Sequence, residues 1–116
     1  MFTITDNNIV DVLLDAQTRG IALRIISDDD KSMDRGSDID RMIARGVPVK
    51  LDRTSAHMHH KFALFDGVTL LTGSYNWTRS AARENEENIV VTNDEHLVHA
   101  FKTQFETLWS RFQLER

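Results

Sequence analysis

Apolar side chains follow helical spacing early in the chain and then form a continuous run. Ile9, Leu13 and Ala16 recur at intervals of three or four residues. The polar residues 6–8 precede them as helix caps, and Gly20 follows them as a C-terminal glycine. Residues 21–27 are then almost all apolar, which is typical of a buried strand in an α/β sheet. This part of the sequence predicts an amphipathic helix followed by a buried strand.

Residues 28–51 predict a loop, a short helix and a short strand. Residues 28–36 gather acids, bases and a glycine without periodicity, so we predict an exposed loop. Ser37 with Asp40 resembles a capping box and predicts a short helix that ends near Gly46. Residues 47–51 predict a short strand, and Pro48 places that strand at an edge or marks its start, because proline has no backbone N–H.

The second half of the chain predicts a hairpin, a third strand and a long helix. Residues 61–65 and 68–72 flank Asp66-Gly67, a dipeptide that favours a tight type I′ turn. Residues 78–86 predict a loop or helical turn, and residues 88–92 a strand. Asn93 is the predicted cap of the last helix, whose apolar stripe we interpret as core: Val98, Phe101, Phe105, Leu108 and Phe112, with Trp109 beside it.

These elements predict an α/β fold, a mixed β-sheet flanked by helices on both faces, in a single domain over residues 1–116. The net charge of −4 and a pI near 5.7 do not indicate a nucleic-acid binder, so any site for a polyanion has to be a local patch. Without cysteine, disulfides and thiol chemistry are excluded. We find no apolar run of membrane-spanning length and no signal-peptide pattern, which predicts a soluble protein or a soluble part of a longer one.

Polar residues that suit phosphodiester chemistry gather between residues 57 and 88. His59 supplies an imidazole near neutral pH, and Lys61 supplies a cation two residues later, on the same side of an extended chain. Ser74 and Asn76 have the same offset and can turn a hydroxyl and a carboxamide to one side. Together these residues predict a small cradle for an anion, and Glu87 is a candidate to accept from the second imidazole nitrogen.

A zinc site is the alternative interpretation of the histidines. His57, His59 and His60 are close in sequence, and histidine is a frequent metal ligand. The chain has no cysteine, however, and the nearby acids fit no familiar zinc spacing. We therefore predict no metal and no other cofactor.

The same spacings resemble the HKD motif of the phospholipase D superfamily. His59-x-Lys61-x4-Asp66 is followed by Gly73-Ser74-x-Asn76 and by Glu87. The runs MHHKFALFD, TGSYNWT and ENIVV are similar to the single-motif group, which includes small bacterial endonucleases and the mitochondrial cardiolipin hydrolase (Zucchini) enzymes. The resemblance implies a homodimer in which two motifs form one composite active site.

The resemblance also implies a role for each residue. His59 of one subunit attacks phosphorus, while His59 of the other protonates the leaving oxygen and then activates water. Lys61 and Asn76 hold the phosphoryl oxygens, Ser74 is a supporting donor and Glu87 binds the imidazole. No metal is needed, because two lysines provide the positive charge. The remaining motif residues, Asp66 and Gly73, are expected to be structural.

The sequence leaves the substrate open. An endonuclease on single-stranded nucleic acid is favoured by four basic residues that flank the motif and can line a groove: Lys50, Arg53, Arg79 and Arg83. A phospholipase D that cleaves cardiolipin or another phospholipid is the alternative, with Tyr75, Trp77 and Phe65 as apolar contacts. A third alternative is a phosphate-binding module without turnover.

The mitochondrial members of the superfamily carry an N-terminal membrane helix, and some animal members carry a zinc-binding insertion with cysteines. This sequence shows neither feature. We therefore predict a soluble member of the bacterial type, located in the cytoplasm.

Overall fold

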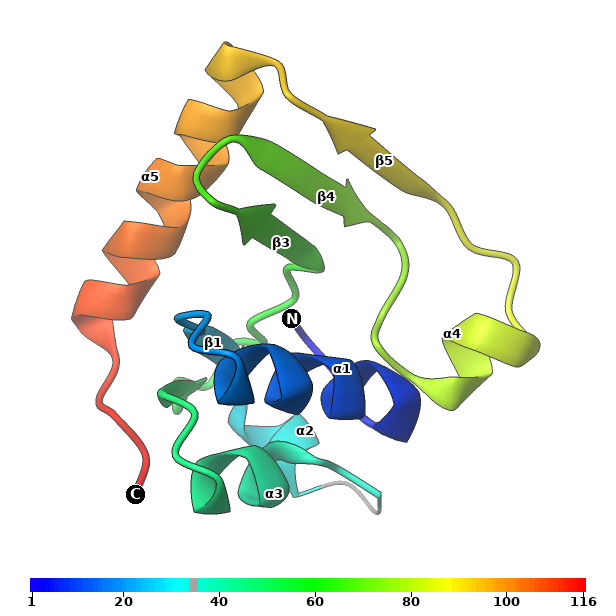
Figure 1. The fold of residues 1–116 in the computed structure, drawn as a ribbon, viewed down its shortest axis with the longest axis vertical. Helices are drawn as coiled ribbons and strands as arrows, with labels where there is room; N and C mark the ends of the chain where they lie inside the picture. Colours follow the sequence, from blue (N-terminus) through cyan, green and yellow to red (C-terminus); the bar gives the residue numbers. More distant parts are fainter. Residues whose placement is uncertain (34–35) are drawn as a thin grey trace.

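The computed structural model describes residues 1–33 and 36–116; Asp34 and Arg35, which fall in the loop predicted over 28–36, lie outside the described residues. The described residues form an α/β fold with helices and two small sheets (Figure 1). In chain order the elements are α1 (Asn7–Thr18), β1 (Ile25–Asp28), α2 (Asp29–Ser32), α3 (Ile39–Ala44), β2 (Val49–Asp52), β3 (Phe62–Phe65), β4 (Thr69–Gly73), α4 (Arg79–Arg83), β5 (Ile89–Thr92) and α5 (Glu95–Arg111).

The first helix follows the predicted pattern. The Asp6 carboxylate accepts from the Asn8 backbone N–H at 2.9 Å and caps α1. Val10 and Leu14 are its buried residues. Gly20, with a φ of +91°, ends the segment in the left-handed conformation that glycine adopts without strain.

The strands β1 and β2 form a parallel pair in which Ile25 lies opposite Val49. The predicted strand over residues 21–27 was too long at its start, because pairing begins only at Ile25 and Ile21 is 46% exposed. Pro48 precedes β2, and its carbonyl accepts from the Ile25 N–H at 3.0 Å. The strand-start position predicted for Pro48 is therefore confirmed.

Two other predictions in this region need correction. Residues 29–32 form the helical turn α2 instead of a loop, since the Asp28 side chain caps it by accepting from the Lys31 N–H at 3.3 Å. The helix α3 starts at Ile39, with Asp38 at the N-cap position and without a side-chain cap hydrogen bond. The Ser37 hydroxyl instead accepts from the Ile39 N–H at 3.4 Å, so the predicted capping box does not form.

The second sheet has the strand order β3-β4-β5, and both pairs are antiparallel. Asp66 and Gly67 connect β3 to β4 with φ values of 57° and 67°. Two consecutive positive φ values are the signature of the type I′ turn predicted from this dipeptide. The hairpin therefore places the motif strand beside β4, as expected.

Helices cover both faces of the β1–β2 pair. Ile25 packs in a core with α1 and α3, whereas the next residue, Ile26, packs with Met58 and Leu108 of α5. Successive strand residues point to opposite faces, so these two cores lie on opposite sides of the sheet. α5 also runs alongside the second sheet (Figure 1). There the Phe101 and Phe62 rings meet edge to face at 5.1 Å. The cap of α5 is Asp94 and not Asn93, because the Asp94 carboxylate accepts from the Leu97 N–H.

Candidate active site

His59 and Lys61 lie in the segment that leads into β3, next to each other and open to solvent. The His59 side chain is exposed, and Lys61 is half-buried. The Lys61 Nζ atom lies 3.0 Å from His59 Nδ1 and 3.5 Å from Nε2, and it donates to the His59 carbonyl at 2.9 Å. An ammonium can donate only to a ring nitrogen that carries no proton. Such a nitrogen has a free lone pair, which is what a nucleophilic imidazole needs.

Ser74 and Glu87 form a second group of polar side chains, between the ends of β4 and β5. The Ser74 hydroxyl donates to Glu87 Oε1 at 2.6 Å and accepts from the Asn88 N–H at 3.1 Å. The Asn85 amide donates to the other carboxylate oxygen at 3.3 Å. These contacts hold both carboxylate oxygens of Glu87 in place, where β4 ends and β5 begins.

The two groups interact electrostatically. Burial lowers the pKa of Lys61 below its ordinary value, and the Glu87 carboxylate acts in the opposite direction. Within the residues that the structure describes, no hydrogen bond joins Glu87 to His59; the Glu87 oxygens accept from Ser74 and Asn85. The structure therefore brings His59, Lys61, Ser74 and Glu87 into one region, and the contact between Glu87 and the imidazole stays a prediction.

Asn76 ties this region to the N-terminal segment. Its Oδ1 atom accepts from the Thr3 N–H at 3.2 Å, and the Trp77 N–H donates to the Thr3 carbonyl at 3.1 Å. Trp77 packs against the core that α1 and α3 share, so its ring has a structural role here. The carboxamide of Asn76 is thus oriented by backbone on the neighbouring segment.

Gly73 holds the Ser74 group in register, and a side chain there would not fit. A Cβ atom at this position would lie 2.2 Å from the Asn88 carbonyl oxygen, which also accepts from the Ser74 N–H at 3.1 Å. We expect Gly73→Ala to lower the free energy of unfolding by roughly 2 kcal/mol, the scale of an overpacked site, and to reduce activity by displacing Ser74 and Glu87. Urea unfolding and a phosphodiesterase assay measure the two effects.

Gly20→Ala is the matched control for that substitution. Gly20 also has a positive φ, but nothing lies within 4 Å of a Cβ built on it. Its cost is backbone strain alone, roughly 1 kcal/mol, and activity should be unchanged. Equal destabilisation by the two variants with full activity in both would show that Gly73 does not position the site.

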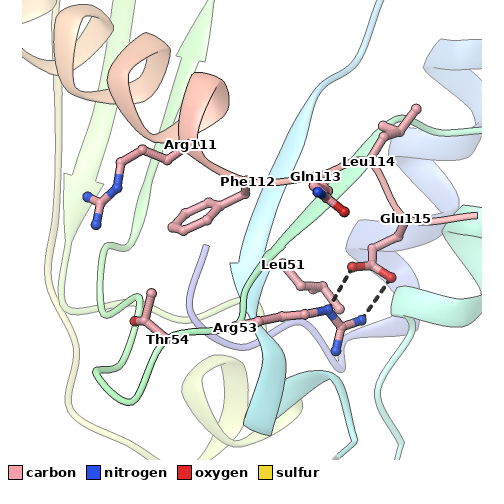
Figure 2. A pocket seen from close by; sticks show the side chains of 8 residues that line it. All are labelled: Leu51, Arg53, Thr54, Arg111, Phe112, Gln113, Leu114 and Glu115. Carbon is pink, nitrogen blue, oxygen red and sulfur yellow. Dashed lines mark hydrogen bonds and ion pairs between the residues drawn. The ribbon is translucent and has the colours of Figure 1, made fainter.

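The four predicted substrate-binding residues divide into two pairs. Lys50 donates to the Trp109 carbonyl at 2.6 Å and lies over the Trp109 ring, and Arg53 makes two hydrogen bonds to Glu115, at 2.9 and 3.1 Å. Arg53 and Glu115 line a hollow of about 530 Å³ between the end of β2 and the C-terminal segment (Figure 2). Arg79 and Arg83 are exposed on α4, in the connection between Asn76 and Glu87.

Sequence reasoning missed Asp28, which the structure places next to the segment that carries His59. Its side chain is fully buried, and its Oδ1 atom accepts from the Met58 N–H at 2.8 Å, directly before His59. The His57 Nδ1 atom lies 3.5 Å from Oδ2. Asp28 therefore anchors the irregular segment that carries His59 to the end of β1. The only signal in the sequence was an acid at the end of an apolar run.

Asp28 also belongs to a group of potential metal ligands. Asp28, Asp30 and His57 each present a ligand atom, and these atoms lie within 4.8 Å of one another. Of the three histidines that we considered for zinc, this group contains only His57. The absence of a metal from the reaction stays a prediction.

Three kinds of comparison identify relatives of this chain. Residues 1–109 match the family model described as cardiolipin synthase, PLD-like domain. Curated relatives include the mitochondrial cardiolipin hydrolases of Chlamydomonas reinhardtii, 49% identical over 97% of this chain and 51% of the relative, and Xenopus tropicalis, 40% identical over 97% and 53%. The chain thus spans about half the length of the curated relatives it matches.

Solved structures agree with the family match. The phospholipase D family member Nuc from Salmonella typhimurium superposes with a TM-score of 0.89 at 29% identity, covering 99% of this chain and 78% of Nuc. NucT from Helicobacter pylori has a TM-score of 0.87 at 21% identity, over 99% of this chain and 79% of NucT, and this likeness concerns the fold.

The predicted location is wrong. We expected a bacterial-type member in the cytoplasm, but the relatives with 37–49% identity over most of the chain are eukaryotic proteins named mitochondrial cardiolipin hydrolase. The error arose because we gave weight to features missing from this sequence. Within residues 1–33 and 36–116, no helix has the length and apolar character needed to cross a bilayer.

The residue pattern around His59, the family match over residues 1–109 and the 49% identity to a curated relative lead to one conclusion: the chain belongs to the phospholipase D-like domain family.

Proposed function

We propose that this chain is a metal-independent phosphodiester hydrolase with His59 as its nucleophile. The observation that carries the proposal is the ammonium of Lys61, 3.0 Å from the His59 ring, beside the hydrogen-bonded pair of Ser74 and Glu87. A nucleophile, a cation for the phosphoryl oxygens and hydrogen-bond donors are the groups that this reaction needs.

The reaction proceeds in two displacements. A ring nitrogen of His59 attacks phosphorus, the P–N bond forms and the P–O bond to the leaving group breaks, while a second imidazole donates a proton to the leaving oxygen. That imidazole then takes a proton from water, whose oxygen attacks phosphorus and breaks the P–N bond. Lys61 and Asn76 hold the non-bridging oxygens, with Ser74 as a further donor. The given sequence holds one HKD motif, and we propose that the second imidazole comes from another copy of the chain.

A homodimer therefore completes the proposed site, and the second sheet offers a surface for it. Phe62 and Leu70 face α5, since the Phe62 ring contacts Phe101 and Leu70 is fully buried. The cross-strand row Ala63, Leu71 and Val91 alternates with these residues and lies on the other face. Lys61 is two residues before Ala63, on that same side of an extended strand.

This face is apolar, and its side chains on the edge strand β5 are exposed to solvent. Ile89 and Val91 of β5 are 51% and 60% exposed. Exposed aliphatic side chains on an edge strand mark an interaction surface in soluble proteins. A second copy on this face would cover them and bring its own His59 and Lys61 towards the first pair.

Single-stranded nucleic acid is the substrate class that we favour. The site is open to solvent, and α4 presents Arg79 and Arg83 without burying them, in the connection between two motif segments. Cations at this place can follow a phosphate backbone beyond the reacting phosphodiester. Lys50 and Arg53 are not part of this argument, because their charges contact Trp109 and Glu115.

Cardiolipin is the alternative, and the names of the relatives favour it. Proteins that match 97% of the chain at 40–49% identity are named mitochondrial cardiolipin hydrolase. The same names support a mitochondrial setting for this protein. Both substrates contain a phosphodiester, so the cradle around His59 accepts either.

A paired assay in EDTA separates the two substrates. We would measure hydrolysis of a labelled single-stranded oligonucleotide and of cardiolipin vesicles, with His59→Ala as the control in both. Cleavage of the oligonucleotide that Arg79→Ala and Arg83→Ala weaken supports the nuclease. Hydrolysis of cardiolipin alone assigns the phospholipid, and no His59-dependent hydrolysis of either overturns the proposal.

The fall in activity at high pH, the alkaline limb of the pH profile, should reflect deprotonation of Lys61. Burial lowers the pKa of Lys61 from its ordinary value of 10.5, so the cation is lost at a lower pH than for a free lysine. Activity that needs this cation should fall as pH rises through that pKa. The same shift makes the folded state more stable as pH rises between that pKa and 10.5, because the unfolded chain then binds more protons.

Lys61→Arg tests this assignment. Arginine stays protonated at these pH values, so the alkaline limb of kcat/KM should move upward in the variant. An NMR titration of the Lys61 side chain in the wild type gives the pKa directly. A limb at the same pH in both proteins, or a Lys61 pKa at or above 10.5, would contradict the prediction.

A further inference from the structure

Phe2 contacts both side chains that the proposed reaction uses most directly. Its ring centroid is 4.5 Å from that of the His59 imidazole, with 46° between the planes. The Lys61 Nζ atom lies 5.2 Å from the same centroid, within the range of a cation–π interaction. The His57 ring meets Phe2 edge to face at 5.6 Å. One half-buried aromatic ring thus touches the nucleophile and its neighbouring cation.

The backbone around Phe2 is held from two sides. The Ser27 hydroxyl, at the end of β1, donates to the Phe2 carbonyl at 3.2 Å. On the other side, the Thr3 N–H donates to Asn76 Oδ1 at 3.2 Å. The ring therefore projects from a fixed segment, which itself lies between β1 and the residues that follow β4.

His59 has less support of its own. It is exposed and lies in the irregular segment before β3, where its rotamers are not restricted by a strand or helix. Asp28 anchors the backbone one residue earlier, at Met58, and does not reach the His59 ring. Nucleophilic attack requires the ring nitrogen at a defined distance and direction from phosphorus. A rigid apolar surface against one side of the imidazole supplies that restriction.

We infer that Phe2 is a positioning residue, which holds the His59 imidazole and the Lys61 ammonium in the orientation needed for attack on a phosphodiester. The inference rests on the proposed function for its catalytic meaning. It assigns a role to an N-terminal residue fifty-seven positions before the nucleophile.

Phe2→Leu tests this role, since it keeps an apolar side chain and removes the ring. The ring current of Phe2 shifts the Cε1–H resonance of His59 in the wild type, and this resonance should move towards its ordinary position in Phe2→Leu. We expect kcat for the phosphodiester bis(p-nitrophenyl) phosphate to fall by roughly ten- to a hundredfold, the scale of a misplaced reacting group, with a much smaller change in KM. His59→Ala identifies the resonance.

Two further variants make the result specific. Phe2→Tyr keeps the ring and should retain both the resonance and kcat. Phe101→Leu removes a ring of α5 that meets Phe62 edge to face and, among the described residues, makes no ring contact with His59, so it should leave both unchanged. The amide fingerprint in NMR spectra establishes that each variant is folded, and an unfolded Phe2→Leu is replaced in the test by Phe2→Met.

The outcomes separate this inference from the proposed function. A His59 resonance that does not move in Phe2→Leu would overturn the positioning role, and so would a moved resonance with unchanged kcat. Neither result would affect the assignment of His59. Turnover that survives in His59→Ala would instead overturn the proposed function, whatever Phe2 does.

Discussion

Replacing His59 with alanine is expected to reduce kcat by roughly four to six orders of magnitude, the scale seen when an enzyme loses its nucleophile. The exposed His59 side chain makes ring contacts with Phe2 and Lys61 but fills no core position, so the variant should keep its fold. Hydrolysis of bis(p-nitrophenyl) phosphate in EDTA measures the activity, and thermal unfolding measures the stability.

His96→Ala is the control for that substitution. His96 is an exposed histidine in the first turn of α5, directly after the connection that leads from β5. Its removal should change neither kcat nor the melting temperature. Activity of His59→Ala within tenfold of the wild type would contradict the role of His59, whereas loss of folding in that variant would call for His59→Asn, which retains a polar side chain of smaller size.

Val91→Asp is expected to dissociate the homodimer and to abolish most of the activity. Val91 is 60% exposed on the face that also carries Ala63 and, by alternation, Lys61. When two copies meet, a carboxylate at this position would be buried without a partner. The free energy of removing it from water would strongly destabilise the dimer, whereas in the monomer the carboxylate stays hydrated. We expect a loss of at least a hundredfold at micromolar protein, because a monomer holds only one of the two histidines.

Val90→Asp is a closely matched control. Val90 is 55% exposed and adjacent in the chain, but it pairs with Thr72 on the face that α5 contacts. Sedimentation equilibrium and activity should therefore separate the two variants. A wild-type protein that is monomeric and fully active would contradict the composite site, and equal effects of the two substitutions would place the contact elsewhere on β5.

Local chemistry made the hairpin and the first helix predictable. The Asp66-Gly67 turn needs two positive φ values, and few other dipeptides accept them, so the turn and the pairing of β3 with β4 followed from two residues. The stripe of α1 and its Gly20 end are equally local. The structure places Lys61 beside His59 and Ser74 beside Glu87, and the Glu87 carboxylate acts electrostatically on Lys61, whereas the roles assigned from the motif spacing stay predictions.

The corrections concern boundaries that depend on tertiary partners. The start of β1 is set by Val49 of β2, which the sequence of residues 21–27 cannot indicate. Helix caps moved by one residue at Asp38 and Asp94, since neighbouring polar residues compete for the same position.

The least predictable features join residues that are far apart in sequence. Lys50 and Arg53 appeared as free cations near the motif, but their partners Trp109 and Glu115 follow about sixty residues later. Asp28 and Phe2 contact the motif segment from the N-terminal quarter of the chain, thirty or more residues away. No periodicity or spacing rule connects such positions, because the connection is made by the packing of β1 and the N-terminal segment against the motif.

The stereochemistry at phosphorus tests the central claim most directly. A chiral phosphorothioate diester, cleaved by the wild-type protein in EDTA, reports how many displacements occur. Two in-line displacements through a phosphohistidine at His59 predict net retention of configuration at phosphorus. Net inversion would show that water attacks the substrate in a single step, and it would contradict the nucleophilic role proposed for His59.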